Sequence, residues 1–533
     1  MSEALLAVES LDVALGGTRI LRDLSFELGR GEVLGLVGAS GCGKSMTALA
    51  IMRLLPVGAA MQGAVRLLGE DLCGKSGAQM QALRGRTVGM VFQEPMTALN
   101  PLMSIGAQVA ETVRLHGAAS RHAARRAARE ALDAVGLSGD AGALDRMPFE
   151  LSGGQRQRVA IAMAIAMAPR LLIADEPTTA LDVITQAQVL TLLKDLARSR
   201  RMGMLLITHD LAVVAQLADR VAVMHEGQIL ERGATAEVLR HPRHPQTQAL
   251  IAAATPRPKR VCAEAPGPRV LCASHVIKEY PRRRRSIFTA PPPLRAVDDV
   301  SLRVHAGETV GLVGESGSGK SSLLQVILAL RRAERGGVSL LGEDFPNARG
   351  ARLRALRRAI QAVFQDPRSS FDGRWTVADI IAEPYFLLDT PPNPSERRRN
   401  VAEVLVQVGL DPRDAARLPH EFSGGERQRI AIARALITQP AVIAFDEAVS
   451  ALDVLVRGQI LELLAQLSRS AKLAYLFVTH DLHVIRAIAD RVYVMQHGRI
   501  VEHGVTADVF NAPQHEYTQA LIAATPTLAT VLA

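Results

Sequence analysis

The chain has 533 residues, which is enough for two to four domains that each bury a core of their own. Hydrophobic residues make up 48% of it and charged residues 22%, a balance that excludes a disordered chain. The net charge of +9 permits contact with nucleic acid or with an anionic membrane surface and demonstrates neither.

The sequence predicts neither a membrane span nor a secretory signal. The longest apolar run, residues 159–168, is far shorter than the ~20 residues that cross a bilayer. The N-terminus, MSEALLAVES, lacks a basic segment followed by an apolar core. The four cysteines, at positions 42, 73, 262 and 272, include no CxxC pair, so we expect free thiols in a reducing compartment rather than a metal site. These features predict a soluble, cytoplasmic protein that serves a membrane only from outside the lipid.

The first chemical motif along the chain is GASGCGKS at residues 38–45, which matches the phosphate-binding pattern G-x-x-x-x-G-K-[ST]. It follows the apolar run EVLGLVG, which is typical of a buried parallel strand, and it opens a predicted helix. In such a loop the backbone N–H groups wrap a phosphate, the Lys reaches the β- and γ-phosphates, and the Ser binds Mg²⁺. The predicted nucleotide-binding residues are Gly38, Ala39, Ser40, Gly41, Cys42, Gly43, Lys44, Ser45 and Met46, with Ser45 also a Mg²⁺ ligand.

Further motifs of the first half follow apolar runs that read as strands. Gln93 follows VGMVF and could reach both Mg²⁺ and the attacking water. Residues 121–135 have the Ala-rich composition and apolar spacing of a one-sided helix. Asp175 is then predicted to hold Mg²⁺ through water, and Glu176 to act as the general base. His209, in the sequence THD, is predicted to sense the γ-phosphate.

The stretch SGGQRQR, at residues 152–158, has no Lys of its own. Its first residues begin a predicted helix, whose free N–H groups and positive dipole end suit a γ-phosphate. We therefore count Ser152, Gly153, Gly154 and Gln155 among the nucleotide-binding residues.

Every one of these motifs recurs, in the same order, in the second half of the chain. The step from the Ser of SGG to the Asp is 23 residues in both halves, and the step from that Asp to the His is 34. The chain is therefore a tandem duplication. The second set comprises Gly314, Glu315, Ser316, Gly317, Ser318, Gly319, Lys320, Ser321, Ser322, Gln365, Ser423, Gly424, Gly425, Glu426, Asp446, Glu447 and His480, with Ser321, Gln365 and Asp446 as predicted Mg²⁺ ligands.

The repeat predicts where the domains begin and end. We expect a first domain at residues 1–256, a linker rich in Pro and charge at 257–269, and a second domain at 270–533. The two tails, HPRHPQTQALIAAATP and APQHEYTQALIAATP, correspond. Four consecutive arginines, residues 282–285, lie in an irregular stretch of the second unit. They form either a solvated loop or a contact with anionic lipid or another protein.

Taken in order, the phosphate loop, VFQ-P, SGG-RQR, DE followed by ALD, and THD resemble the nucleotide-binding domain of ABC transporters. The resemblance covers essentially the whole chain, twice. It implies an α/β fold of tandem P-loop NTPase domains, each with a mostly parallel sheet core, an antiparallel β subdomain and an inserted helical subdomain at about residues 95–165 and 366–436. It also implies ATP and Mg²⁺ as cofactors and head-to-tail pairing of the units. Residues 423–425 would then cap the ATP held by Lys44, and residues 152–154 the ATP held by Lys320.

Further stretches are similar to ATPases of peptide and nickel importers. They are the two tails and the segments VFQEPMTALNP and AYLFVTHDLHVIRA. A single chain with both ATPases looks most like the fused ATP-binding subunit of microcin C and oligopeptide importers, and the glutathione importer's ATPase is a near relative. This resemblance implies an ATPase on the cytoplasmic face of the inner membrane that binds no nucleic acid. It would work with two membrane permeases and, indirectly, an extracytoplasmic binding protein.

Two alternatives from other classes fit the sequence less well. Tandem ABC ATPases that act on ribosomes resemble one another in a long charged helical linker between the units. Here only 111 residues separate His209 from Lys320. A DNA-repair ATPase of similar architecture would need CxxC pairs, which this chain lacks.

The sequence also departs from the family pattern in ways that predict an asymmetry. Tyr280 is placed to stack on adenine upstream of the second phosphate loop, whereas Leu15 stands near that position in the first unit. In the second unit Ala448 replaces the usual Pro after the glutamate, and SSFDGRWTV, at residues 369–377, replaces the usual Asn-Pro-Arg turn. Neither change removes a charged catalytic group. We therefore predict two hydrolysis-competent sites, of which the first binds ATP more loosely.

Overall fold

The computed structural model describes residues 4–93, 98–117, 120–137, 142–179, 181–255, 267–281, 292–450 and 452–528. The chain forms two compact units, built mainly from Met1–Thr255 and Pro256–Thr525. Most of the predicted linker, residues 257–266, and the arginine run at 282–285 lie outside the described residues. Within the described ranges, no helix combines the length and the apolar character that crossing a membrane requires.

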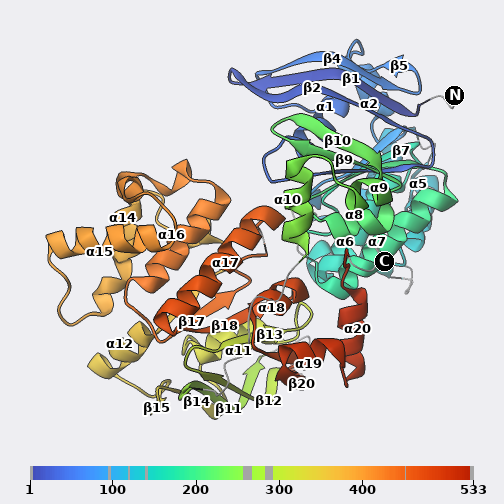
Figure 1. Ribbon diagram of the computed structural model, residues 1–533. Helices are drawn as coiled ribbons and strands as arrows, with labels where there is room; N and C mark the ends of the chain where they lie inside the picture. The colour runs from blue at the N-terminus through green and yellow to red at the C-terminus, as the bar shows by residue number, and fades with distance from the viewer. Residues whose placement is uncertain are drawn as a thin grey trace. The chain divides into compact units, whose positions relative to one another are not determined.

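A six-stranded, mostly parallel sheet forms the centre of the first unit (Figure 1). Its strand order is β10-β9-β3-β8-β7-β6, in which only β9 and β10 pair antiparallel. Strands β3, β7 and β8 are buried along their whole length, which is why their sequences are almost unbroken apolar runs. The strands are β3 (Val33–Gly38), β6 (Val88–Val91), β7 (Leu171–Asp175), β8 (Gly203–Thr208), β9 (Arg220–His225) and β10 (Gln228–Ala234).

A second, antiparallel sheet of the first unit has the order β2-β1-β4-β5. One core cluster joins Leu6 and Val8 of this sheet to Ile51 of helix α1 and to Leu36 and Ile173 of the central sheet. Helix α1, which follows the phosphate loop, is therefore anchored in a core that both sheets share. The elements are β1 (Leu6–Leu15), β2 (Thr18–Leu28), α1 (Lys44–Ile51), β4 (Ala59–Leu67), β5 (Glu70–Asp71) and α2 (Gly77–Leu83).

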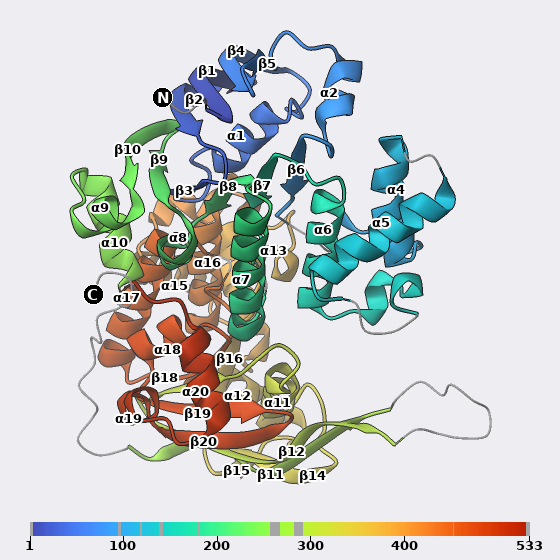
Figure 2. The same cartoon turned by 90° about the vertical axis from the view of Figure 1, so that its right-hand side faces the viewer.

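Between β6 and β7 the chain forms a helical lobe that stands apart from the antiparallel sheet (Figure 2). It contains α4 (Ile105–Leu115), α5 (Arg121–Ala134), the short turns η1 (Ala143–Asp145) and η2 (Pro148–Glu150), and α6 (Gly153–Ile165). Helix α5 buries Ala124, Ala128 and Leu132 on one face, as its spacing predicted. The unit is completed by α7 (Val183–Ser199), α8 (Leu211–Leu217), α9 (Thr235–Arg240) and α10 (Pro245–Ala254).

The second unit repeats this architecture, with sheets of order β16-β17-β18-β13-β19-β20 and β12-β11-β14-β15 and a helical lobe built around α14, α15 and α16 (Figure 1). Its strands are β11 (Arg269–Tyr280), β12 (Leu294–His305), β13 (Thr309–Val313), β14 (Arg335–Leu340), β15 (Glu343–Asp344), β16 (Ile360–Val363), β17 (Val442–Asp446), β18 (Ala474–Thr479), β19 (Arg491–Gln496) and β20 (Arg499–Val505).

The helices of the second unit are α11 (Lys320–Ile327), α12 (Gly350–Ala359), α13 (Pro367–Ser370), α14 (Val377–Ala382), η3 (Glu383–Leu387), α15 (Pro394–Gln407), η4 (Pro412–Ala416), η5 (Pro419–Glu421), α16 (Gly424–Leu436), α17 (Val454–Ala471), α18 (Leu482–Ile488), α19 (Thr506–Asn511) and α20 (Glu516–Ala524). The predicted fold class is confirmed: each unit has a mostly parallel core sheet, an antiparallel β subdomain and an inserted helical subdomain.

Candidate functional site

The predicted phosphate loop of each unit joins a fully buried strand to a helix. In the first unit β3 ends at Gly38 and α1 begins at Lys44, whose Nζ donates to the carbonyl oxygens of Gly38 and Ala39 at 2.9 and 2.8 Å. In the second unit the Nζ of Lys320 donates to the carbonyl oxygens of Gly314 and Glu315, both at 2.7 Å. Each Lys is buried with its ammonium group turned into the loop, where a phosphate-binding loop needs its positive charge.

The loop conformation requires glycine at the residue before each Lys. Gly43 and Gly319 cap their helices with φ values of 103° and 106°, in the left-handed region. A Cβ on Gly43 would lie 2.6 Å from Leu21 Cδ2, and one on Gly319 would lie 2.2 Å from the carbonyl oxygen of Ala296. Both the backbone angle and the close packing of the antiparallel sheet therefore exclude a side chain here.

Four of the predicted residues of the first unit meet at the carboxyl edge of the central sheet. Gln93 lies just after β6, Asp175 ends β7, Glu176 follows it, and His209 follows β8. Strands β6, β7 and β8 are neighbours and parallel, so their carboxyl ends lie side by side. The fold thereby brings Glu176 and His209 together although 33 positions separate them in the sequence.

Asp175 is the buried carboxylate of this edge. The residue is 4% exposed, and its Oδ1 atom is buried with no hydrogen-bond partner among the residues that the structure describes. Burial raises the pKa of Asp175 to about 6. A hydrogen bond from Ser45 opposes this rise, and the charge of Glu176 adds to it. The pKa of Asp446, its counterpart in the second unit, is also raised, by burial and by the charge of Glu447.

Glu176 accepts hydrogen bonds from three side chains. Gln93 Nε2 and Thr179 Oγ1 lie 3.2 and 2.9 Å from Glu176 Oε2. His209 Nδ1 lies 3.0 Å from Glu176 Oε1. Burial opposes ionisation of Glu176, but the hydrogen bond and charge of His209, with the bond from Thr179, outweigh it and lower its pKa to about 2. Glu176 is therefore an ionised hydrogen-bond acceptor held in place by its donors, whereas burial favours the protonated form of its neighbour Asp175.

Glu447 occupies the same place in the second unit with fewer side-chain donors. His480 Nδ1 lies 3.0 Å from Glu447 Oε1. The pKa of Glu447 is lowered, because the hydrogen bond and charge of His480 outweigh burial. Gln365 lies just after β16, as Gln93 lies after β6, but among the described residues it makes no hydrogen bond to Glu447.

Both glutamates have an unusual backbone. Glu176 and Glu447 have φ values of 46° and 48°, a left-handed conformation that costs a non-glycine residue about 1–3 kcal/mol. Their N–H groups donate to the carbonyl oxygens of Ile207 and Val478, on the neighbouring strands, at 2.9 and 2.8 Å. The same strained turn in both units aims each carboxylate at the histidine that follows the next strand.

The two Ser-Gly-Gly segments begin helices, as predicted. Ser152 and Ser423 cap α6 and α16 in capping boxes with Gln155 and Glu426, which leaves the first-turn N–H groups oriented along the helix axis. A Cβ on Gly154 would lie 2.1 Å from Thr185 Cγ2, so this glycine allows α6 to pack closely against the first turn of α7.

The predicted adenine positions are equivalent in the structure. Leu15 is the last residue of β1, and Tyr280 is the last residue of β11. The Nζ atom of Lys278 lies 5.3 Å from the centroid of the Tyr280 ring and is held by Glu334 Oε1 at 2.7 Å. The first unit thus has an aliphatic side chain where the second has an aromatic ring.

Sequence reasoning missed two contributors to these sites. The Thr179 hydroxyl donates to the Glu176 carboxylate. The sequence could have indicated this contact, because both repeats have a hydroxyl residue three positions after the glutamate. Tyr517, on α20, accepts a hydrogen bond at 2.8 Å from the N–H of Glu315 in the phosphate loop. No local pattern predicts a contact between residues 202 positions apart.

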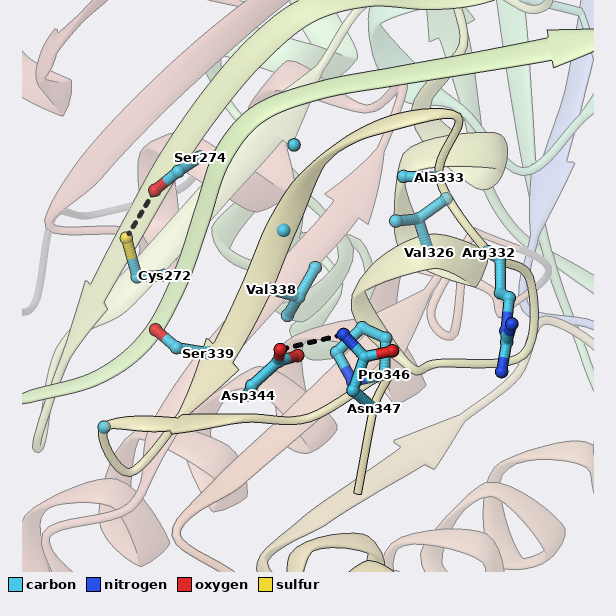
Figure 3. A pocket seen from close by; sticks show the side chains of 13 residues that line it. Cys272, Ser274, Val326, Arg332, Ala333, Val338, Ser339, Asp344, Pro346 and Asn347 are labelled. Carbon is cyan, nitrogen blue, oxygen red and sulfur yellow. Dashed lines mark hydrogen bonds between the residues drawn. The ribbon is translucent and has the colours of Figure 1, made fainter. Parts of the chain in front are cut away.

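A pocket of about 580 Å³ lies elsewhere in the second unit, beside β14 (Figure 3). Cys272 and Ser274 of β11, whose Sγ and Oγ atoms lie 3.3 Å apart, and Ser339 of β14 line one side of it. On the same face of the first unit, Arg66 forms an ion pair with Glu9 at 3.1 Å instead. None of the predicted site residues lines the pocket in the described part of the chain.

Comparisons with known proteins show the family to which the chain is related. A family model described as "ABC transporter" matches residues 21–179 and 297–450, and one described as "Oligopeptide/dipeptide transporter, C-terminal region" matches residues 501–532. The glutathione import ATP-binding protein GsiA of Escherichia coli strain K12 is 44% identical, over 98% of this chain and 89% of its own length. Its counterpart from Shigella flexneri is 45% identical over the same shares.

Among solved structures, cbiO1 from Clostridium perfringens, described as part of an ABC transporter complex, is 23% identical with a TM-score of 0.40. The match covers 46% of this chain and 92% of that one. The matches to the family model and to the full-length relatives confirm the predicted family. The chain therefore belongs to the ABC transporter family, as an ATPase with two fused nucleotide-binding units and the C-terminal region of oligopeptide and dipeptide transporters.

Proposed function

We propose that this chain is the energy-coupling subunit of a bacterial importer for small peptides and that it drives transport through two separate membrane permeases. The observation that carries the proposal is the duplicated carboxylate–histidine pair, 3.0 Å apart in both units, at the edge of a sheet that also carries a phosphate loop. The importer assignment is supported by the oligopeptide/dipeptide transporter region and by relatives named for glutathione import, glutathione itself being a tripeptide. Di- and oligopeptides or a microcin C-like peptide are the proposed cargo, with glutathione or nickel as alternatives.

The residues around Asp175 suit a magnesium ion. The Oδ1 of Asp175, which has no partner within the described ranges, and the hydroxyl of Ser45, which bonds the same carboxylate, are the hard oxygen ligands that Mg²⁺ prefers. Ser45, Asp175 and Gln93 would hold the ion in the first site. Ser321, Asp446 and Gln365 would hold it in the second. When bound, the ion neutralises charge on the phosphates.

The protein's own groups then prepare the water. Glu176 and Glu447 stay ionised at neutral pH, because the pKa of each is lowered, and each can accept a hydrogen bond from a water that attacks the γ-phosphate. His209 and His480 fix the orientation of these carboxylates and stand where a γ-phosphate would be sensed. Lys44 and Lys320 supply the positive charge for the β- and γ-phosphates.

The Ser-Gly-Gly helix starts complete the sites in this proposal. The N–H groups at the start of α6 and α16 suit a γ-phosphate oxygen, and family resemblance assigns each to the nucleotide held by the other unit. Closure of the two units around ATP would then shift the permeases between their inward- and outward-facing states. The chain would act at the cytoplasmic face of the inner membrane as a peripheral subunit.

Exposed apolar side chains near the two glutamines support a permease partner. Phe92 and Leu102 of the first unit are 45% and 85% exposed, and Phe364 and Trp375 of the second are 40% and 41% exposed. Each unit thus exposes a Phe directly before its glutamine, and aromatic side chains are enriched in protein-binding faces. We propose that the helical lobes bind the permeases here.

Uptake by cells that carry or lack the gene tests the function. Labelled tripeptide, glutathione and nickel are offered to the wild-type strain, a deletion strain, and a deletion strain that expresses Lys44→Ala/Lys320→Ala. We expect uptake of a peptide, and not of nickel, to be lost in the deletion and to stay lost with the double variant. Unchanged uptake of all three, with the chain recovered on ribosomes instead of membranes, contradicts the proposal and favours the translation alternative.

A further inference from the structure

The second unit contains an ion pair that the residues of the first unit cannot form, because Gln186 stands at the position of its arginine. Arg457, in the first turn of α17, donates from Nη1 to Asp481 Oδ2 at 2.5 Å and from Nη2 to the carbonyl oxygen of Leu452 at 3.1 Å. The side chains of Arg457 and Asp481 are only 18% and 15% exposed. Asp481 directly follows His480, and Leu452 lies in the loop that leads away from Glu447. Arg457 therefore connects the segments that carry both partners of the carboxylate–histidine pair.

Asp481 also organises the helix that follows His480. Its Oδ1 atom accepts hydrogen bonds from the N–H groups of His483 and Val484 at 2.9 and 3.4 Å, which caps α18. Burial alone would disfavour the charged carboxylate, but the charge of Arg457, with those of His483 and His480, lowers its pKa. Arg457 thus keeps this cap ionised, and an ionised cap binds N–H groups more strongly than a neutral one.

These contacts close into a ring. His480 bonds Glu447 at 3.0 Å, and the loop after Glu447 is folded on itself by hydrogen bonds from the N–H of Ser450 to Glu447 and of Leu452 to Val449, at 3.2 and 3.3 Å. Arg457 then bridges the end of this loop to Asp481, which is covalently next to His480. The ring thus links the segments of Glu447 and His480 through partly buried polar contacts.

The first unit holds its glutamate in another way. Gln186 stands where the second unit has Arg457, four residues after the Asp that caps the long helix. The Glu176 carboxylate is held by Gln93 and Thr179 directly. In the second unit the hydroxyl of Ser450 instead donates to the backbone carbonyl of Glu447, at 2.6 Å. Both glutamates contact a histidine, but the first unit adds direct side-chain contacts to the carboxylate, whereas the second unit adds a tie through an arginine.

We propose that Arg457 is a positioning residue of the second ATP site, which holds the loop after Glu447 and the loop of His480 in the arrangement that hydrolysis needs. It acts through Asp481 and Leu452, touches neither nucleotide nor attacking water, and has no counterpart role at Gln186. The inference rests on the proposed roles of Glu447 and His480 and goes beyond them.

The test isolates the second site in the full-length chain. In a Glu176→Gln background, which silences the first site, Arg457→Gln is expected to lower kcat for ATP by about 10–100-fold, because a small displacement of catalytic groups has effects of this order. KM for ATP should change by less than about 2-fold, since binding energy does not pass through Arg457. Arg457→Lys, which keeps the charge, should recover part of kcat. The matched control is Gln186→Ala in a Glu447→Gln background, with an expected change in kcat below about 2-fold.

A second variant separates positioning from folding. Asp481→Asn keeps a good helix cap but cannot pair with Arg457, so it should reproduce the loss in kcat while Trp375 fluorescence, which reports the second unit, keeps its native unfolding profile. Normal kcat in both Arg457→Gln and Asp481→Asn overturns the proposal, as does a loss expressed only in KM. If Glu447→Gln retains activity in the same Glu176→Gln background, the proposed base itself is wrong, whatever Arg457 does.

Discussion

Replacing Asp175 by Asn should stabilise the first unit of the metal-free, nucleotide-free protein while abolishing hydrolysis there. The reason is that folding buries this carboxylate and raises its pKa from an ordinary 3.8 to about 6. A carboxyl group whose pKa rises on folding binds its proton more tightly in the folded state, so the folded protein loses stability as the pH rises above 3.8 and the carboxyl ionises. Asn removes that charge and can still accept the Ser45 hydrogen bond.

The magnitude follows from the two pKa values. The interval from 3.8 to about 6, at about 1.36 kcal/mol per pH unit, corresponds to about 3 kcal/mol. The full gain applies well above pH 6, about half of it remains at pH 5, and it disappears below pH 3.8. Incomplete burial in a fluctuating protein makes about 3 kcal/mol an upper value.

Hydrogen exchange of the core strands measures this gain in the right unit. All five Tyr residues and the single Trp lie in the second unit, so their fluorescence does not report on the first. Amides of β3, β7 and β8, in fully buried strands, should exchange up to about 100-fold more slowly in Asp175→Asn than in wild type at pH 8 with EDTA. The surface variant Asp133→Asn is the charge control and should leave exchange unchanged. Equal exchange in Asp175→Asn and wild type, or a gain that does not shrink at pH 5, would show that burial of the Asp175 carboxylate does not destabilise the first unit.

Two further predictions concern packing around the nucleotide and the helix starts. Leu15→Tyr should tighten ATP binding at the first site and Tyr280→Leu should weaken it at the second, each by about 1–3 kcal/mol, since base–aromatic stacking has this magnitude. ATP titrations measure this in Lys320→Ala and Lys44→Ala proteins, which each retain one site. Equal ATP affinity of the two unmodified sites counts against the asymmetry. Gly154→Ala should destabilise the first unit by about 1–3 kcal/mol, because its Cβ would lie 2.1 Å from Thr185 Cγ2. Gly153→Ala should destabilise it far less, because the nearest atom to its Cβ would be 3.8 Å away. Similar hydrogen-exchange rates of α6 amides in the two variants would contradict this difference in packing.

Much of the site could be predicted from sequence because its residues end neighbouring strands. Gln93, Asp175 and His209 each follow an apolar run, and runs of that kind form adjacent parallel strands whose carboxyl ends share one edge. The duplicated spacing showed that both sets belong to one architecture, and the fold class and family are confirmed. The domain boundaries and the roles of the individual site residues stay predictions.

What the sequence could not show depends on packing in three dimensions. Asp175 and Glu176 are adjacent carboxylates with the same apparent chemistry, yet their pKa values move in opposite directions, to about 6 and about 2. The difference arises because burial of Asp175 outweighs the hydrogen bond from Ser45 that favours its charge, whereas Glu176, turned by its positive φ, meets Thr179 and His209. The ion pair between Arg457 and Asp481 also could not be predicted from the sequence, because 24 positions separate the two residues.

Steady-state ATP hydrolysis by the purified 533-residue protein, with and without Mg²⁺, shows whether Glu176 and Glu447 activate the attacking water. We expect Mg²⁺-dependent activity that persists in part in Glu176→Gln and in Glu447→Gln alone. In the Glu176→Gln/Glu447→Gln double variant it should fall by about 10²–10⁴-fold, the usual contribution of a general base, while ATP binding is retained. Full activity in the double variant would contradict the assignment of these two glutamates as the groups that activate water.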